Sequence, residues 1–231
     1  MSIYIVGEIC GQWGGDIHRA ERMILQCKMH GASAVKLQLF DTYKLPGENR
    51  ELWEYLMVSK DNFLHLKQYA EMLNIDFFAS VFDYERFQWT QEANIKINKI
   101  ASSMLLWNIE LCREIAATGK LTYCSLGRWG HKEYPFLNDN VKYFHCAFKY
   151  PQDTKDAIDE LPSQFDDKLV GYSDHSCGLE AAKEAVCRGA TIIEKHFTTD
   201  HSLQCKTESA HVCSMDWRQL EELRNFCDKI K

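Results

Sequence analysis

Short apolar segments alternate with amphipathic segments along almost the whole chain. Eight apolar runs can be traced, most of them rich in β-branched or aromatic residues, at 3–9, 33–40, 75–82, 95–102, 120–127, 141–148, 168–175 and 191–198. Side chains of these types favour strands, and a run that is apolar at nearly every position is typical of a parallel strand buried on both faces. The pattern therefore predicts eight strands, several of them parallel and fully buried.

Segments with the apolar spacing of a helix separate most of these runs. They cover 17–32, 60–74, 85–94, 108–120, 154–165, 178–190 and 215–230. Gly31 is placed to end the first helix, and Ser214 is a candidate amino-terminal cap for the last one. The segment between the fifth and sixth runs, RWGHKEYPFLNDN, is too short and broken for a full helix.

Strands that alternate with helices in this way predict an α/β fold. We expect a single-domain (β/α)8 TIM barrel over residues 1–231, with a shortened or missing helix after strand five. The alternative is a doubly wound open sheet. A nucleotide-binding open sheet is disfavoured, because the sequence has neither G-x-G-x-x-G after the first strand nor a phosphate-loop motif.

Composition narrows the choice of partner and compartment. The net charge of −6 argues against nucleic acid as the main partner, but it is compatible with a local basic pocket for a phosphorylated substrate. We expect a cytoplasmic chain without a membrane span, because no basic signal region and no run of about 18 apolar residues is present. The ten cysteines form no C-x-x-C motif, which argues against a zinc ribbon, and we expect reduced thiols.

Polar residues recur where the expected strands end, which is where active sites of such barrels lie. A charged residue in an apolar strand is costly unless it is paired, so one such residue would suggest a structural ion pair. Several of them at equivalent strand ends favour a shared pocket instead. The candidates are Glu8, Lys36, Gln38, Ser80, Lys99, Ser102, Ser125, Arg128, His145, Tyr150, Ser173, Asp174, His175, Glu194, Lys195 and His196.

These residue types suit a particular chemistry. Lys36, Lys99 and Arg128 can hold a phosphate or a carboxylate. Strands seven and eight are neighbours in a barrel, so His175 and His196 can converge and, with a glutamate, help to bind a divalent metal. Without the barrel the two histidines have no reason to meet. The role of His145 stays open between a core residue and a site residue.

Several motifs occur in the order of one known family. They are E-I near residue 8, AVKLQ at 34–38, NKIASS at 98–103, HCAFKYP at 145–151, GYSDHS at 171–176, GA-x-x-IEKHFT at 189–198 and CSM at 213–215. Together they resemble the sialic acid synthase (NeuB-type) family. The resemblance implies a barrel that condenses phosphoenolpyruvate with an N-acetylated aldose and releases phosphate.

The resemblance also implies a role for individual positions. His175, His196 and Glu8 would form the site of a divalent metal, Mn²⁺ or Mg²⁺, with Glu8 holding the metal-bound water or acting as a base. Phosphoenolpyruvate would be held by Lys36, Ser80, Lys99, Ser102 and Ser173. Gln38 and Tyr150 would face the sugar, and we expect Ser125 and Arg128 to bind substrate as well.

Five departures from the family pattern concern mainly the sugar. GQWGG replaces N-H-x-G after the first strand, Met104 replaces a glutamate that contacts the sugar, and Phe148 replaces an Asn or Ser. The P-G-P-D motif after strand eight is absent, and Glu208 is a candidate substitute for its aspartate. The sequence stops at Lys231 without the family's antifreeze-like domain. The resemblance suggests a homodimer, but the family's dimers exchange that domain, so the sequence leaves the oligomeric state open.

We therefore expect a metal-dependent synthase with a different aldehyde acceptor. Two alternatives remain open at this point. One is a barrel that binds metal and phosphorylated ligand without catalysis, and the other is an aldolase or another phosphoenolpyruvate-using synthase of the same fold.

Overall fold

A computed structural model describes residues 2–48, 50–147, 149–203 and 212–230. Eight parallel strands form a closed barrel in the order of the sequence, with β8 paired to β1. The strands are β1 (Tyr4–Glu8), β2 (Ala34–Leu39), β3 (Asp76–Val81), β4 (Ile97–Ile100), β5 (Leu121–Ser125), β6 (Val141–Cys146), β7 (Leu169–Asp174) and β8 (Ile192–His196). The predicted barrel is confirmed, and each strand lies within the apolar run that predicted it.

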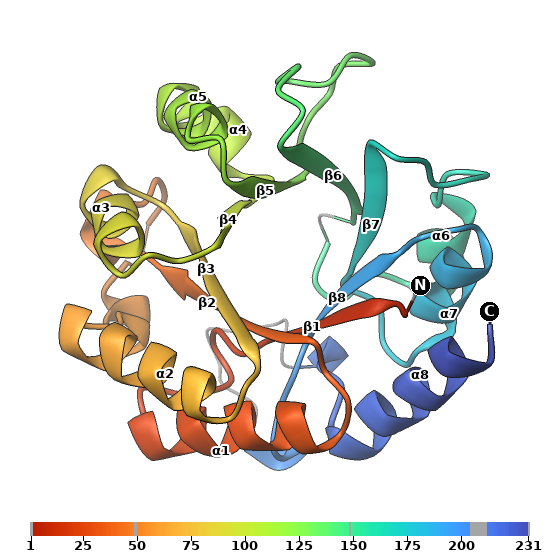
Figure 1. The fold of residues 1–231 in the computed structure, drawn as a ribbon, viewed down its shortest axis with the longest axis horizontal. Helices are drawn as coiled ribbons and strands as arrows, with labels where there is room; N and C mark the ends of the chain where they lie inside the picture. Colours follow the sequence, from red (N-terminus) through yellow and green to blue (C-terminus); the bar gives the residue numbers. More distant parts are fainter. Residues whose placement is uncertain (1, 49, 148, 204–211, 231) are drawn as a thin grey trace.

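Helices surround the barrel on its outside (Figure 1). The α-helices are α1 (Ile17–Met29), α2 (Lys60–Met72), α3 (Tyr84–Glu92), α4 (Met104–Trp107), α5 (Ile109–Ala117), α6 (Thr154–Asp159), α7 (Glu180–Cys187) and α8 (Trp217–Lys229). Short 3-10 helices cover Thr42–Lys44, Arg50–Leu56 and His201–Leu203. No helix lies between β5 and β6, as predicted, and an extended loop takes its place (Figure 1).

Helix α1 shows how the sequence produces these elements. Its buried residues are Ala20, Met23, Ile24 and Cys27, a spacing that places them on one face of the helix. Asp16 caps the helix, since its carboxylate accepts hydrogen bonds from the backbone N–H groups of residues 18 and 19. The buried face packs so closely on β1 that a Cβ at Gly7 would lie 2.6 Å from Cys27 Sγ.

Three details of the helices differ from the sequence-based expectation. Helix α8 is capped by Asp216 rather than by Ser214, because Asp216 forms a reciprocal capping box with Gln219. Helix α6 ends at Asp159, well before residue 165, and Pro162 follows shortly after that end. Helix α4, a single turn after β4, was not predicted.

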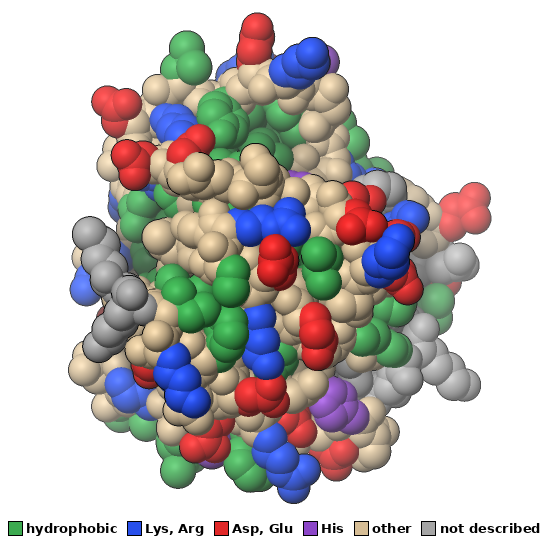
Figure 2. Space-filling model, turned by 90° about the vertical axis from the view of Figure 1, so that its right-hand side faces the viewer, with side chains coloured by type: hydrophobic (Ala, Val, Ile, Leu, Met, Phe, Trp, Pro, Cys, Tyr) green, Lys and Arg blue, Asp and Glu red, His purple; other side chains and the backbone are tan. Residues whose placement is uncertain are grey.

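The core consists of the strands and the inner faces of the helices. Buried apolar side chains dominate it, and Cys124 and Cys146 are among the buried free thiols that the structure describes. The face of the molecule in Figure 2 carries acidic and basic side chains interspersed. Among the described helices, none combines the length and the apolar character needed to cross a membrane.

Candidate active site

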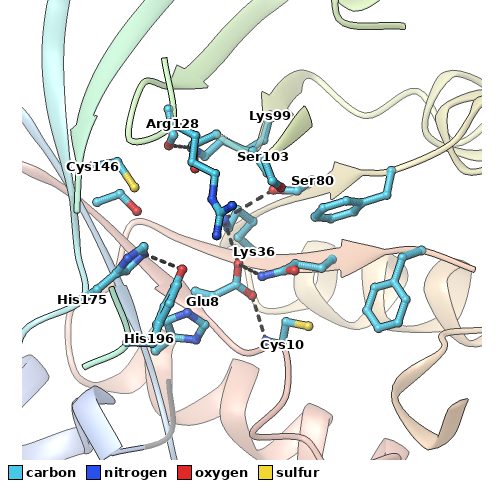
Figure 3. Close-up of a pocket in the computed structure, with 18 of the residues that line it drawn as sticks. Glu8, Cys10, Lys36, Ser80, Lys99, Ser103, Arg128, Cys146, His175 and His196 are labelled. Atoms are coloured by element: carbon cyan, nitrogen blue, oxygen red, sulfur yellow. Dashed lines mark hydrogen bonds and ion pairs between the residues drawn. The ribbon is translucent and has the colours of Figure 1, made fainter. Parts of the chain in front are cut away.

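A cavity of about 480 Å³ opens at the carboxyl ends of the strands (Figure 3). It brings together the candidate residues that the structure describes, with the exception of His145. They are Glu8, Lys36, Gln38, Ser80, Lys99, Ser102, Ser125, Arg128, Tyr150, Ser173, Asp174, His175, Glu194, Lys195 and His196. The remaining predicted residue, Glu208, lies outside the described residues, as does Phe148. These residues therefore line one cavity, while the role of each residue stays a prediction.

Four charged side chains form a chain of ion pairs at the bottom of the cavity. Lys36 Nζ lies 2.7 Å from Glu8 Oε2 and 3.0 Å from Glu194 Oε1. Lys99 Nζ lies 3.6 Å from the other oxygen of Glu194. All four residues are buried, with relative exposures of 1% to 5%. Pairing therefore offsets the loss of hydration that each charge suffers.

Strand register explains why these side chains meet. Glu8 is the Cα partner of Lys36 on one side and of His196 on the other. Side chains alternate along a strand, so Glu194 and His196 point to the same face of β8. The parallel ladder thus turns residues that are far apart in sequence into neighbours.

The surroundings shift the pKa values of these groups in different directions. Burial raises the pKa of Glu8, and Glu194 adds to that effect, although Lys36 opposes it. Glu194 is also buried, but Lys36 and Lys99 lower the pKa of its carboxyl to about 2. Burial lowers the pKa of Lys99, whereas the two carboxylates outweigh burial at Lys36 and raise the pKa of its ammonium group. Of the four groups, Glu8 and Lys99 are thus the two shifted towards their neutral forms.

Serine hydroxyls surround the charged groups. Lys36 donates to Ser80 Oγ at 3.4 Å, and Lys99 donates to Ser125 Oγ. Ser173 donates to Glu194 Oε1 at 2.9 Å. Ser102 lines the same cavity. Lysines and hydroxyls clustered in this way provide several donors for the oxygens of a phosphate or a carboxylate.

The two histidines converge on one side of the cavity. Their ring centroids lie 6.1 Å apart, and Tyr150 contacts both rings. Tyr150 Oη lies 2.7 Å from His175 Nε2, and Gln12 Oε1 lies 3.1 Å from His196 Nδ1. His175 and His196 therefore converge in one cavity, as neighbouring strands of the barrel allow.

The histidine pair has features that suit a divalent metal. His175 Nδ1 is buried and has no hydrogen-bond partner in the described part of the chain. Burial, together with His196, lowers the pKa of His175 well below its usual value, which favours the neutral imidazole that binds metals. Glu8, the third expected ligand, pairs with Lys36 instead. No group of three or more His, Cys, Asp or Glu side chains within the described ranges is arranged to hold a metal ion.

Two residues that the sequence singled out, His145 and Met104, do not line the cavity. His145 stacks against Tyr172 with the ring centroids 5.9 Å apart, and it is not among the residues that line the cavity. Met104, at the position of a sugar-contacting glutamate in the family resemblance, is buried at 1% exposure and does not line the cavity either. Met104 therefore offers no contact to a sugar bound in the described cavity.

Sequence reasoning missed an aromatic wall and Gln12, and it did not foresee the contacts of Glu194. Phe40, Phe82 and Trp107 line the cavity, and the ring of Phe82 lies 6.2 Å from that of Phe40 and 6.3 Å from that of Trp107 between centroids. Glu194 stood out only as a charged residue at a strand end, although its spacing from His196 indicates a shared face. Gln12 had no signal, because it lies in the loop that departs from the family pattern.

Comparison with known proteins shows the family of the chain. The chain matches the profile of the NeuB family over residues 23–231. The N-acetylneuraminate-9-phosphate synthase of Drosophila melanogaster is 30% identical over 261 aligned positions, which cover 100% of this chain and 68% of that protein. The N,N'-diacetyllegionaminic acid synthase of Legionella pneumophila is 28% identical over 264 positions, covering 100% of this chain and 72% of that protein.

A solved structure of a similar protein has the same fold. The crystal structure of an N-acetylneuraminic acid synthetase from Leptospira borgpetersenii, in complex with citrate, superposes with a TM-score of 0.89 at 31% identity. The superposition covers 100% of this chain and 84% of that one. The chain therefore belongs to the NeuB family and is a transferase similar to the sialic acid synthases.

Proposed function

We propose that the chain condenses phosphoenolpyruvate with a sugar aldehyde to give an ulosonic acid and phosphate, and that it needs a divalent cation. One observation carries the proposal. A single cavity places three cationic side chains, Lys36, Lys99 and Arg128, beside two converging histidines. The names of the synthases that the chain resembles support the same reaction class.

The lysine side of the cavity suits phosphoenolpyruvate. This substrate carries a phosphate and a carboxylate, and Lys36, Lys99 and Arg128 supply matching positive charge. Ser80, Ser102, Ser125 and Ser173 add hydroxyl donors around the same space. Because Lys36 and Lys99 already contact Glu8 and Glu194, a bound phosphate competes with these carboxylates for the two ammonium groups.

The histidine side suits the aldehyde. His175 and His196 would hold the divalent cation, which supplies Lewis-acid polarisation of the aldehyde oxygen. Gln38 lies beside Glu8, with Nε2 3.4 Å from Oε2, and Tyr150 lies against His175, so both can donate to hydroxyls of an open-chain sugar. The acceptor contacts at this end differ from the family pattern at Met104, which supports an aldehyde other than N-acetylmannosamine.

The bonds and charges of the proposed reaction balance as follows. The electron pair of the C2–C3 double bond forms the new bond from C3 to the aldehyde carbon, which leaves C2 cationic and the former aldehyde oxygen as an alkoxide. Water adds to the cationic C2 and passes a proton to Glu8, whose raised pKa suits a base that must also release protons. Glu8 returns this proton to the alkoxide. The C2–O bond to phosphate then breaks, and the proton of the C2 hydroxyl leaves with the phosphate to give the 2-keto acid, while Lys36 and Lys99 stabilise the charge on the leaving phosphate.

Phosphate release tests the proposal. Purified protein, phosphoenolpyruvate and Mn²⁺ or Mg²⁺ are incubated with a panel of aldoses, and inorganic phosphate is measured. We expect release only with a suitable aldose and a divalent cation, and loss of release in Glu8→Ala and His175→Ala. His145→Gln, which alters a histidine outside the cavity, is the matched control and should keep the activity. Calorimetric binding of phosphoenolpyruvate without turnover across the panel would instead favour the non-catalytic barrel.

A further inference from the structure

A second buried ion pair lies next to the two histidines. Lys195 Nζ is 2.7 Å from Asp174 Oδ2, and the two side chains are exposed by only 1% and 0%. Asp174 and Lys195 are Cα partners in the ladder between β7 and β8. Each immediately precedes a histidine in the sequence, so this pair ties together the two strand ends that carry His175 and His196.

Both partners also fix the residue that follows His175. Asp174 Oδ1 accepts hydrogen bonds from Ser176 N at 2.9 Å and from Ser176 Oγ at 2.7 Å. Lys195 Nζ donates to the carbonyl oxygen of Ser176 at 2.6 Å. His175 therefore lies between two residues that this network holds in place, and its own carbonyl oxygen accepts from Gln152 N at 2.9 Å.

The network is separate from the charges that surround the proposed phosphate position. Side chains alternate along β7 and β8, so Asp174 and Lys195 point to the face opposite Ser173 and Glu194. The printed contacts agree, because Ser173 donates to Glu194 while Asp174 pairs with Lys195. Among the described residues, the hydrogen bonds of the Asp174 and Lys195 side chains go to Tyr172, Ser176 and each other.

Stability alone is a weak reason for such a pair. Burying two charges removes their hydration, and well-packed apolar residues of similar volume often serve stability equally well. A buried pair does, however, specify one geometry, because both charges must keep their partners. Partners beyond the direct ligands of a metal commonly set ligand orientation in this way.

We propose that Asp174 and Lys195 are positioning residues that hold the imidazoles of His175 and His196 at the separation required to bind one divalent cation between them. The inference rests on the proposed function for the presence of the cation. The position of the two imidazole rings can be tested without it. It assigns a role to two residues that line the cavity but are not direct ligands in the proposed arrangement.

The central variant is the double substitution Asp174→Asn with Lys195→Met, which removes both charges and keeps the approximate volumes. Mn²⁺ affinity is measured by electron paramagnetic resonance of the free ion. We expect it to fall about tenfold or more while the melting temperature stays close to that of the wild type. An unchanged Mn²⁺ affinity would overturn the proposal, whatever happens to the melting temperature.

Two milder variants keep the test decisive if the double variant does not fold. Ser176→Ala removes one hydrogen bond to Asp174 and should weaken Mn²⁺ binding by a smaller factor. Tyr172→Phe removes a longer contact, 3.3 Å from Asp174 Oδ1, and leaves the ion pair intact, so it is the matched control. Equal Mn²⁺ affinity in Ser176→Ala and Tyr172→Phe would contradict the proposal.

Imidazole NMR separates this inference from the proposed function. The ¹H–¹⁵N signals of His175 and His196 are assigned with His175→Gln and His196→Gln and compared in metal-free protein. We expect both sets of signals to shift in the double variant and in Ser176→Ala, and to stay in place in Tyr172→Phe. Unshifted signals would overturn the positioning role even if the wild type proves to be an active synthase. Shifted signals in a protein without turnover would support the positioning role and count only against the synthase.

Discussion

Lys36 Nζ lies 2.7 Å from Glu8 Oε2 at the carboxyl ends of two adjacent strands, with both side chains buried. Glu194 contacts the same ammonium group from β8 at 3.0 Å. One lysine thus balances two carboxylates in a site that is proposed to receive an anionic substrate. An anionic substrate that binds here must compete with Glu8 and Glu194 for the ammonium group of Lys36. Substitutions at these residues should therefore change both protein stability and substrate binding.

Replacing Lys36 by Met should affect stability and substrate binding together. It leaves Glu8 and Glu194 without this buried cation, so we expect a loss of about 3 kcal/mol or more in the free energy of unfolding. Phosphoenolpyruvate affinity should fall about 30-fold or more, because a buried charge partner is lost. Urea denaturation and calorimetry measure the two effects. Lys96→Met, at an exposed lysine before β4, should change neither.

Glu194 should make stability depend on pH in the acid range. Its pKa in the folded protein is about 2, below the ordinary value of 4.5, because Lys36 and Lys99 outweigh burial. Its contribution to stability is therefore complete above pH 4.5 and is lost as the pH falls towards 2. From the size of that shift, we expect the stability difference between wild type and Glu194→Gln to shrink by about 3 kcal/mol over this window.

Glu8 should change protein stability with pH in the direction opposite to Glu194, and it therefore serves as an internal control. Burial raises its pKa in the folded protein, so ionisation of Glu8 reduces stability as the pH rises above the ordinary value. Glu8→Gln should therefore gain stability relative to the wild type as the pH rises from about 4.5. Parallel pH dependences of the Glu8→Gln and Glu194→Gln variants in urea denaturation would contradict the assignment of the two carboxylates.

The histidine pair should control metal binding without controlling phosphoenolpyruvate binding. Substituting His175 or His196 by Gln removes one of two proposed ligands, so Mn²⁺ affinity should fall about 100-fold or more. Phosphoenolpyruvate affinity in the absence of metal should change by less than about threefold, because its proposed contacts lie at the lysines. His145→Gln is the matched control. A similar loss of Mn²⁺ affinity in His145→Gln would place the metal elsewhere.

Tyr150 should affect the acceptor more than phosphoenolpyruvate. Its hydroxyl lies 2.7 Å from His175 Nε2, and the side chain is 40% exposed at the cavity. Tyr150→Phe removes a hydrogen bond but keeps the ring contact, so we expect KM for the aldose to rise about tenfold. KM for phosphoenolpyruvate should stay within about twofold. Steady-state kinetics with each substrate varied in turn make this comparison, and an effect confined to phosphoenolpyruvate would refute the placement of the acceptor.

The sequence predicted the barrel well because its signal repeats along the chain. Eight apolar runs gave the eight strands, and the broken segment after β5 correctly indicated a missing helix. Helix ends were less predictable. Ser214 and Asp216 both qualify as caps by residue type, and only the reciprocal contact with Gln219 selects Asp216. The single turn of α4 was missed because four residues carry no measurable periodicity.

The location of the site was predictable from the sequence, but the ion pairs among its charged side chains were not. Polar residues at successive strand ends must meet once the barrel closes, which is why His175 and His196 converge. Which charged residue contacts which depends on strand stagger and on the length of each side chain. For that reason the placement of Glu194 between Lys36 and Lys99 and the separate pair of Asp174 with Lys195 became clear only in the structure.

The most direct test of the proposed condensation follows the oxygen atom that bridges carbon and phosphorus in phosphoenolpyruvate. Substrate labelled with ¹⁸O at this position is incubated with the protein, Mn²⁺ and a panel of aldoses, and both products are analysed by mass spectrometry. The proposed condensation should give an ulosonic acid whose carbon skeleton combines the aldose with the three carbons of pyruvate, and phosphate that retains the ¹⁸O. Phosphate released without the label, or no condensation product across the panel although phosphoenolpyruvate and metal bind, would contradict it.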